Sequence, residues 1–194
     1  MWKQMLPGLR MTLWLTVLTG LIYPGIVTGL CQILFPRQAG GSLIVKDGRI
    51  VGSALIGQSF TRPEYFQPRP SAAGNDGYDA MASGGSNLGP TSQKLVDRVK
   101  VSIEKFHREN PDFSGPIPAD LSTASASGLD PDISPASAAA QAQRVAKARN
   151  VSASQIQTLV NQFTRGRDLG FLGEPRVNVL LLNLTLDERY AVRQ

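Results

Sequence analysis

The sequence contains very few of the residues that build disulfide frameworks and metal centres. Its 194 residues include one cysteine and one histidine. A single cysteine excludes a disulfide within the chain, and a single histidine leaves no His/Cys cluster for zinc. Acidic side chains are also missing from residues 1–36, where Lys3 and Arg10 are the only charged side chains. The N-terminal region therefore differs in kind from the rest of the chain.

An uncharged, apolar segment runs from Met11 to Phe35. As a helix it would extend ~37 Å, enough to cross a hydrocarbon core of about 30 Å with some tilt. A cleaved signal peptide is the competing interpretation, but its apolar stretch is usually shorter, and no small-x-small cleavage site follows Phe35. A lipoprotein anchor at Cys31 is disfavoured by the bulky residue before it. We expect an uncleaved transmembrane helix over residues 11–36, after a short cytoplasmic end over 1–10.

The charges that flank this segment indicate its orientation. Lys3 and Arg10 precede it, while Arg37 and two further cations follow it. Long domains cross membranes largely regardless of nearby charge, so the short basic end carries more weight under the positive-inside rule. We expect residues 37–194 to form an extracytoplasmic domain of a single-pass membrane protein.

The expected membrane helix carries more than lipid-facing side chains. Hydroxyl and small residues recur along it at helical spacing: Thr12, Thr16, Thr19, Tyr23, Gly25 and Gly29. In lipid, small residues let backbones approach closely, and hydroxyls can bond across a helix interface. The alternative is that threonine bonds to carbonyls of its own helix and that glycine is simply frequent in membrane helices. We predict that this face packs against partner helices and that Pro24 kinks the helix.

Residues 37–194 show helix signals at three places. Thr91 can cap a helix with one apolar face that ends near Glu109, before a proline. Ser134 followed by proline is a well-formed helix start, and a capping box begins at Ser152.

Two further patterns predict strands. Asp47–Gly48 joins two β-rich runs and indicates a hairpin. Val177–Leu186 is apolar on both alternating faces, as in a strand covered on both sides, and we expect it to pair with the hairpin. The predicted fold class is α+β, a single N-terminal transmembrane helix followed by one compact mixed α/β domain.

No catalytic constellation stands out in the sequence. His107 lies near a helix end between Phe106 and Arg108, and nothing positions a nucleophile beside it. An extracytoplasmic hydrolase that uses Ser83 or Ser86 with His107 is therefore only an alternative. We predict no catalytic residues and no metal ligands.

A Gly/Ser/Asn loop is the best candidate for a ligand contact. It consists of Ser83, Gly84, Gly85, Ser86 and Asn87. Its backbone N–H groups could wrap an anion near a helix N-terminus, but the loop lacks the Gly-Lys-Ser/Thr ending of a phosphate-binding P-loop. A structural turn is the simpler interpretation.

Five cations and no acid occur between residues 133 and 167, namely Arg144, Lys147, Arg149, Arg165 and Arg167. We expect an ordinary solvated face here, although headgroups or an acidic partner are alternatives. Nucleic acid is disfavoured as a partner of an extracytoplasmic domain.

Several stretches together resemble the C subunit of the Kdp-type potassium-transporting ATPases. They are YFQPRPS at 65–71, SGGSNLGPT at 83–91, TASASGLDPDISPA at 123–136, QRVAKAR at 143–149 and GFLGEPRVNV at 170–179. The resemblance covers nearly the whole chain, including the single N-terminal span. It implies an accessory subunit in a bacterial cell membrane rather than an enzyme.

The resemblance also implies partners. They are a channel-like potassium-translocating subunit, a P-type ATPase subunit and a small single-helix subunit, besides membrane lipid. The complex imports potassium at the expense of ATP, and the C subunit acts as a catalytic chaperone that raises ATP affinity. It holds no stable cofactor of its own, and ATP acts through the complex. If residues 37–194 lie outside the cytoplasm, their effect on ATP affinity must be transmitted through packed helices. If they lie in the cytoplasm, the loop 83–87 becomes the leading candidate for contact with the nucleotide. A membrane-anchored ligand-binding or sensor module without pump partners is the alternative function.

Overall fold

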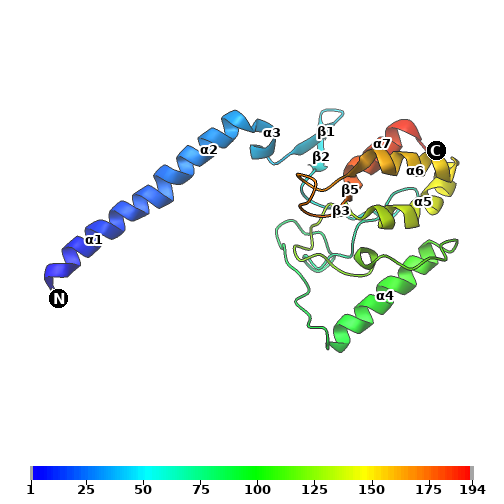
Figure 1. Cartoon of the computed structure of the whole chain (residues 1–194), viewed down its shortest axis with the longest axis horizontal. Helices are drawn as coiled ribbons and strands as arrows, with labels where there is room; N and C mark the ends of the chain where they lie inside the picture. Colours follow the sequence, from blue (N-terminus) through cyan, green and yellow to red (C-terminus); the bar gives the residue numbers. More distant parts are fainter. Residues whose placement is uncertain (1, 193–194) are drawn as a thin grey trace. The chain divides into compact units, whose positions relative to one another are not determined.

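The computed structural model describes residues 2–192, in two compact units divided between Val51 and Gly52 (Figure 1). The first unit holds a long helix and most of a hairpin. The second holds most of the remaining helices, a small sheet and the long loops between them.

The helix of the first unit consists of α1 (Trp2–Val17), a π-helical turn η1 (Leu18–Ile22) and α2 (Tyr23–Leu34). The stretch Lys3–Leu34 is long and apolar enough to cross a membrane. Residues 11–34 of the expected span lie in one continuous helix, which begins at Trp2 and so includes residues that we placed before the bilayer. The helix ends before Phe35, and Pro36 begins the next helix, so the last two residues of the expected span lie outside it.

The π-turn has a local cause in Pro24. Proline lacks an N–H, and its ring clashes with the carbonyl four residues earlier, here that of Gly20. The helix therefore widens into a π-helical turn, in which the Tyr23 N–H donates to the carbonyl of Leu18, five residues earlier. The proline thus accounts for the π-helical turn that precedes it, while the kink that we expected at Pro24 stays a prediction.

A short helix α3 (Pro36–Ala39) leads into β1 (Leu43–Lys46) and β2 (Arg49–Ser53), which pair as a hairpin. Asp47 and Gly48 adopt φ values of 50° and 75° between the strands. Two positive φ values are typical of the tight turn that Asp-Gly favours, so the predicted hairpin is confirmed.

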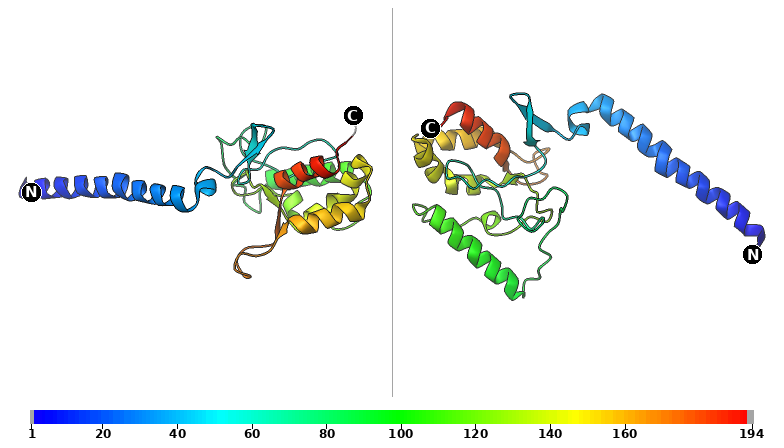
Figure 2. Two further views of the ribbon diagram at one scale, coloured as in Figure 1. Left: turned by 90° about the horizontal axis from the view of Figure 1, so that it is seen from above. Right: turned by 180° about the vertical axis from the view of Figure 1, so that it is seen from behind.

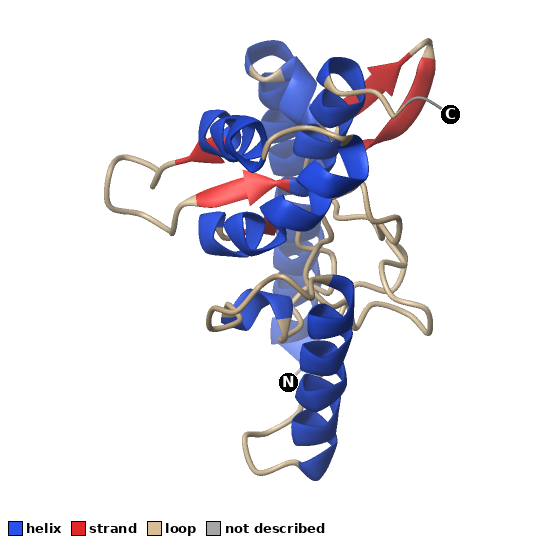
Figure 3. Ribbon diagram, turned by 90° about the vertical axis from the view of Figure 1, so that its right-hand side faces the viewer, coloured by secondary structure: helices blue, strands red, loops and turns tan. Residues whose placement is uncertain are grey.

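The sheet of the second unit is antiparallel, with strand order β3-β5-β4. Figure 3 shows the strands of the chain in red among the helices. Its strands are short: β3 (Asp132–Ile133), β4 (Thr164–Arg165) and β5 (Arg176–Asn178). Val177 in the central strand lies opposite both Ile133 and Thr164.

Three helices pack around this sheet and one another (Figure 2), namely α5 (Pro135–Arg149), α6 (Ala153–Phe163) and α7 (Val179–Arg189). Both predicted caps are present: Ser134 accepts from the Ser137 N–H, and Ser152 with Gln155 completes a capping box. Their apolar faces form the main core, whose fully buried side chains include Phe66, Ile133, Val145, Ile156, Leu159, Val160, Val177, Leu182 and Leu186.

A second, smaller core lies under α4 (Gln93–Glu109). Phe106 of this helix packs with Ala140 and with Leu121 of the 3-10 turn η2 (Ala119–Leu121). The predicted helix is confirmed, but its N-cap is Ser92 rather than Thr91, and the Ser92 side chain makes no capping bond.

The prediction of a strand over Val177–Leu186 is wrong beyond Asn178. There the Asn178 side chain accepts the Leu181 N–H and begins α7. Its buried residues Val179, Leu182 and Leu186 recur at the helical spacing of three and four, and leucine favours helix over strand. The strand that does form, β5, pairs with β3 and β4 and not with the hairpin.

Candidate functional site

The only histidine lies on an exposed part of α4. His107 contacts the ring of Phe106, with 6.2 Å between the ring centroids. Ser83, one of the two serines that the hydrolase alternative would use, donates its hydroxyl to the Ser127 carbonyl. Within residues 2–192 no three His, Cys, Asp or Glu side chains gather as a metal site would require.

The loop 83–87 is tied to the segment 125–128. The Ser127 carbonyl accepts both the Ser83 hydroxyl, at 3.0 Å, and the Gly84 N–H, at 2.8 Å. Added side-chain atoms have no room at this crossing, because a Cβ on Gly85 would lie 2.9 Å from the Ala126 oxygen. The glycines therefore serve close backbone contact, and one of the N–H groups that could have wrapped an anion is already used.

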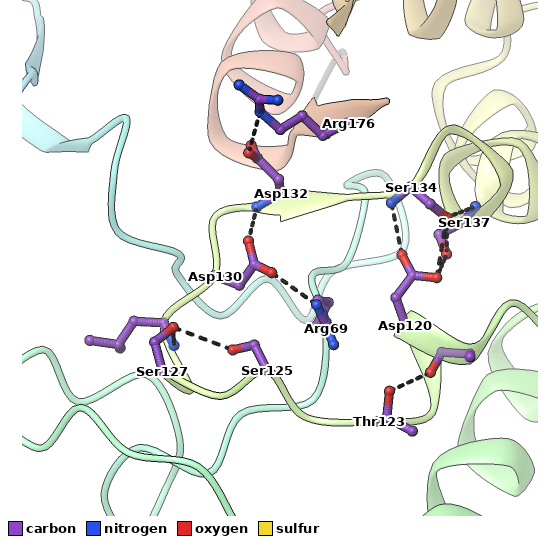
Figure 4. Close-up of polar contacts among 12 residues, drawn as sticks. Arg69, Asp120, Thr123, Ser125, Ser127, Asp130, Asp132, Ser134, Ser137 and Arg176 are labelled. Carbon is purple, nitrogen blue, oxygen red and sulfur yellow. Dashed lines mark hydrogen bonds and ion pairs between the residues drawn. The ribbon is translucent and has the colours of Figure 1, made fainter. Parts of the chain in front are cut away.

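Carboxylates organise the segment from Asp120 to Ser137 (Figure 4). Asp120 accepts the Ser134 N–H at 2.7 Å and the Ser137 hydroxyl at 2.5 Å, so it braces the start of α5. Asp130 accepts the Asp132 N–H at 3.0 Å and an Arg69 N–H at 2.9 Å. These acids hold a turn in place rather than forming an acid–base pair.

The two acids that flank Pro131 are paired with different cations. Asp130 binds Arg69, while Asp132 lies 3.5 Å from Arg176 of β5 (Figure 4). Burial raises the pKa of Asp132, although the Asn178 amide and Arg176 oppose that rise.

A small cleft of about 230 Å³ opens between α4 and residues 67–78. Its walls carry two cations, Arg69 and Lys105, and two acids, Asp76 and Glu109. Among the described residues, the Arg69 Nε is buried without a hydrogen-bond partner. The cleft is smaller than the roughly 300–1,000 Å³ of ligand pockets and has no excess positive charge, so it does not suit a nucleoside triphosphate. Sequence analysis did not predict this cleft, because the residues that line it come from distant segments.

Tyr78 lines this cleft and donates its hydroxyl to the Arg69 carbonyl at 2.6 Å. Burial, with the Asp130 charge, raises the pKa of Tyr78 above its ordinary value. An acid whose pKa is higher in the folded chain loses its proton first in the unfolded chain, so stability falls as pH rises above about 10.

We therefore expect Tyr78→Phe to matter less at alkaline pH. At neutral pH the variant should lose about 1 kcal/mol, the contribution of one hydrogen bond. Above pH 10 the wild type should lose up to about 1.4 kcal/mol per pH unit relative to the variant, so the gap closes. Urea unfolding of the detergent-solubilised chain, followed by circular dichroism, measures both. If the difference in unfolding free energy between the wild type and the variant stays constant from pH 8 to pH 11, the pKa of Tyr78 is not raised in the folded chain.

The N-terminal apolar helix leaves its small-residue face open. A Cβ added at Gly25 or Gly29 would meet no heavy atom of the described chain within 4 Å. The hydroxyls of Thr12 and Thr19 donate to carbonyls of their own helix, those of Gly8 and Leu15, at 3.0 and 2.7 Å. These two hydroxyls are thus satisfied within the helix, and the glycines supply the capacity of this face for close approach.

The prediction of a solvated basic face is wrong for Arg144 and Arg149, which are 9% and 5% exposed. Arg144 donates to the Asn110 and Gln141 side chains and to the carbonyls of Pro63 and Tyr65. These bonds satisfy a buried cation with neutral oxygens, and burial lowers the pKa of Arg144 without removing its charge.

Arg149 makes a second set of bonds to the same loop. It donates to the carbonyls of Glu64 and Tyr190 and pairs with Asp187 of α7 at 2.8 Å. The two arginines therefore clamp residues 63–65 and the C-terminal helix onto α5. By contrast, Lys147 and Arg167 form exposed ion pairs, as a solvated face would.

Comparison with known proteins places these features in a family. The family model described as "KdpC: K+-transporting ATPase, c chain" matches residues 5–188. The chain belongs to the KdpC family. A Gemmatimonas aurantiaca protein named "Potassium-transporting ATPase KdpC subunit" is 60% identical over 96% of this chain and 94% of its own length. Relatives of the same name from Myxococcus xanthus and Rhodospirillum rubrum are 59% and 56% identical, over 98% of this chain and 90% and 98% of their own lengths.

Membership in the KdpC family confirms the resemblance noted in the sequence. A KdpC chain is a subunit of a potassium-transporting ATPase, which disfavours a sensor that acts without pump partners. In this chain, the open helix face and the exposed surfaces of the second unit are available for contact with other subunits.

Proposed function

We propose that this KdpC chain is a non-catalytic assembly subunit, held in the pump by its membrane helix. The observation that carries the proposal is an apolar helix whose glycines, Gly25 and Gly29 among them, have no neighbour in the described part of the chain. In lipid such a surface gains little until another helix backbone packs against it. The partners are the channel-like potassium-translocating subunit, the P-type ATPase subunit and the small single-helix subunit.

We place residues 37–194 outside the cytoplasm, because Lys3 and Arg10 favour retention of the short N-terminal end inside. From there the chain would raise the ATP affinity of the hydrolysing subunit as a catalytic chaperone. A domain in that position cannot touch cytoplasmic ATP, so its effect must pass through packed helices. These helices would need two arrangements in which the hydrolysing subunit binds nucleotide with different affinity. Contact between the loop 83–87 and nucleotide stays the prediction for the opposite placement.

Thiol labelling in right-side-out vesicles tests this placement. Cys31 is the only cysteine, so a Cys31→Ala background allows single new cysteines to be introduced. Met81 is 98% exposed, and Met81→Cys should react with an impermeant maleimide before the vesicles are opened.

Gln4→Cys, near the other end of the helix, is the matched control and should react only after permeabilisation. The reverse pattern would contradict the outside placement. It would put the loop 83–87 on the side of ATP.

A further inference from the structure

The loop between β4 and β5 carries large apolar side chains into solvent. Leu169, Phe171 and Leu172 are 83%, 69% and 49% exposed. In the left view of Figure 2 this orange loop extends away from the helices of its unit. We call residues 168–172 the knob.

The knob is an ordered turn. Asp168 and Leu172 exchange two backbone hydrogen bonds of 2.9 Å, and the Phe171 N–H donates to the Asp168 carbonyl. Leu169 and Gly170 between them have φ values of 54° and 83°. These are the two positive φ values of a tight hairpin turn.

Leucine at a positive φ is strained, whereas glycine or asparagine would adopt this conformation cheaply. Packing of the Leu169 side chain inside this chain does not compensate for the strain, since the side chain is exposed to solvent. A strained residue that stabilises nothing in its own fold indicates a role outside it.

Ion pairs fix the base of the knob. Arg167 binds both oxygens of Glu174, at 2.9 and 2.8 Å, and Arg176 binds Asp168 at 3.0 Å. Two cations and two acids leave this base without net charge, so nothing here favours an anionic lipid surface. An ordered loop also loses less conformational entropy on binding, which favours a shaped protein pocket.

We infer that the knob inserts into an apolar pocket on another subunit of the potassium pump, with Phe171 as its anchor. The inference rests on the proposed function, because it requires that pump subunits surround this chain. Buried aromatic side chains at the centre of an interface typically contribute most of its affinity, and Phe171 is the aromatic residue of the knob.

Photo-crosslinking in the whole pump tests the inference. The photoreactive p-benzoylphenylalanine replaces Phe171 in the full chain, and the complex is irradiated in native membranes before purification. We expect a covalent product whose mass equals this chain plus another pump subunit. The same residue in place of Met81, which is 98% exposed on another loop, should give no such product.

Several outcomes would overturn the inference: adducts with lipid only, adducts with a second copy of this chain, or no adduct in a chain that still co-purifies with the pump. A chain that fails to co-purify even with Phe171 intact would instead contradict the proposed function, so the two failures are distinguishable.

A second variant separates docking from folding. Leu169→Gly with Phe171→Ala removes the two most exposed apolar side chains of the knob and relieves the strained φ at position 169. We expect the melting temperature of the isolated chain to stay the same or rise, while dissociation from the pump in detergent becomes at least about tenfold faster. Unchanged dissociation would count against the knob.

Discussion

A chain that carries Gly25→Leu and Gly29→Leu should co-purify with the other pump subunits at about a tenth of the wild-type level, or less, in mild detergent. The two glycines lie one turn apart on α2, where a partner backbone can approach only in the absence of side chains. Leucine would hold that backbone away and remove the packing contacts that stabilise the pair. Affinity purification through a tag on the ATPase subunit, followed by quantitative blotting, measures the loss.

These substitutions should leave the N-terminal helix itself unchanged. Since both positions face open space in the described chain, the leucines should not disturb the helix itself. Val27→Phe is the matched control, because position 27 lies about 200° around α2 from position 25. A double-leucine chain that assembles as well as wild type would mean that this face does not dock.

Arg149→Met should lower the free energy of unfolding by about 3 kcal/mol. The substitution leaves Asp187 without its cation and two backbone carbonyls without their donor, in a site where the Arg149 side chain is fully buried. Methionine would fill the space but could not donate hydrogen bonds to the polar groups around position 149. Its apolar contacts would therefore recover little of the lost stability. Urea unfolding of the detergent-solubilised chain, followed by circular dichroism, measures the change.

Arg167→Met is the control for this experiment. It removes a cation from the same part of the sequence, but from an exposed pair with Glu174. We expect a change within about 0.5 kcal/mol. Equal effects of the two substitutions would restore the interpretation of residues 133–167 as one solvated basic face.

Local signals in the sequence predicted local structure well. The hairpin turn at Asp47–Gly48, the Ser134 cap and the capping box at Ser152 depend only on neighbouring residues, and all three are present. The end of β5 was missed because a run of leucines fits both a covered strand and a buried helix. The Asn178 cap, together with helical spacing from Val179, was the signal that could have distinguished them.

The roles of the charged residues could not be predicted in the same way. Arg144 and Arg149 look like surface cations until the loop at residues 63–65 is folded against them, a contact across about 80 positions of sequence. The knob was missed for the opposite reason. Its leucines and phenylalanine look like core residues, and only the fold shows that they face solvent.

The central claim is that the N-terminal helix stays in the bilayer and holds the chain in the pump. Intact-mass spectrometry of the purified, potassium-stimulated ATPase tests it most directly. We expect a subunit of about 20.9 kDa that retains residues 1–36. A chain trimmed near residue 36 and lost from a pump that still transports potassium normally would contradict it.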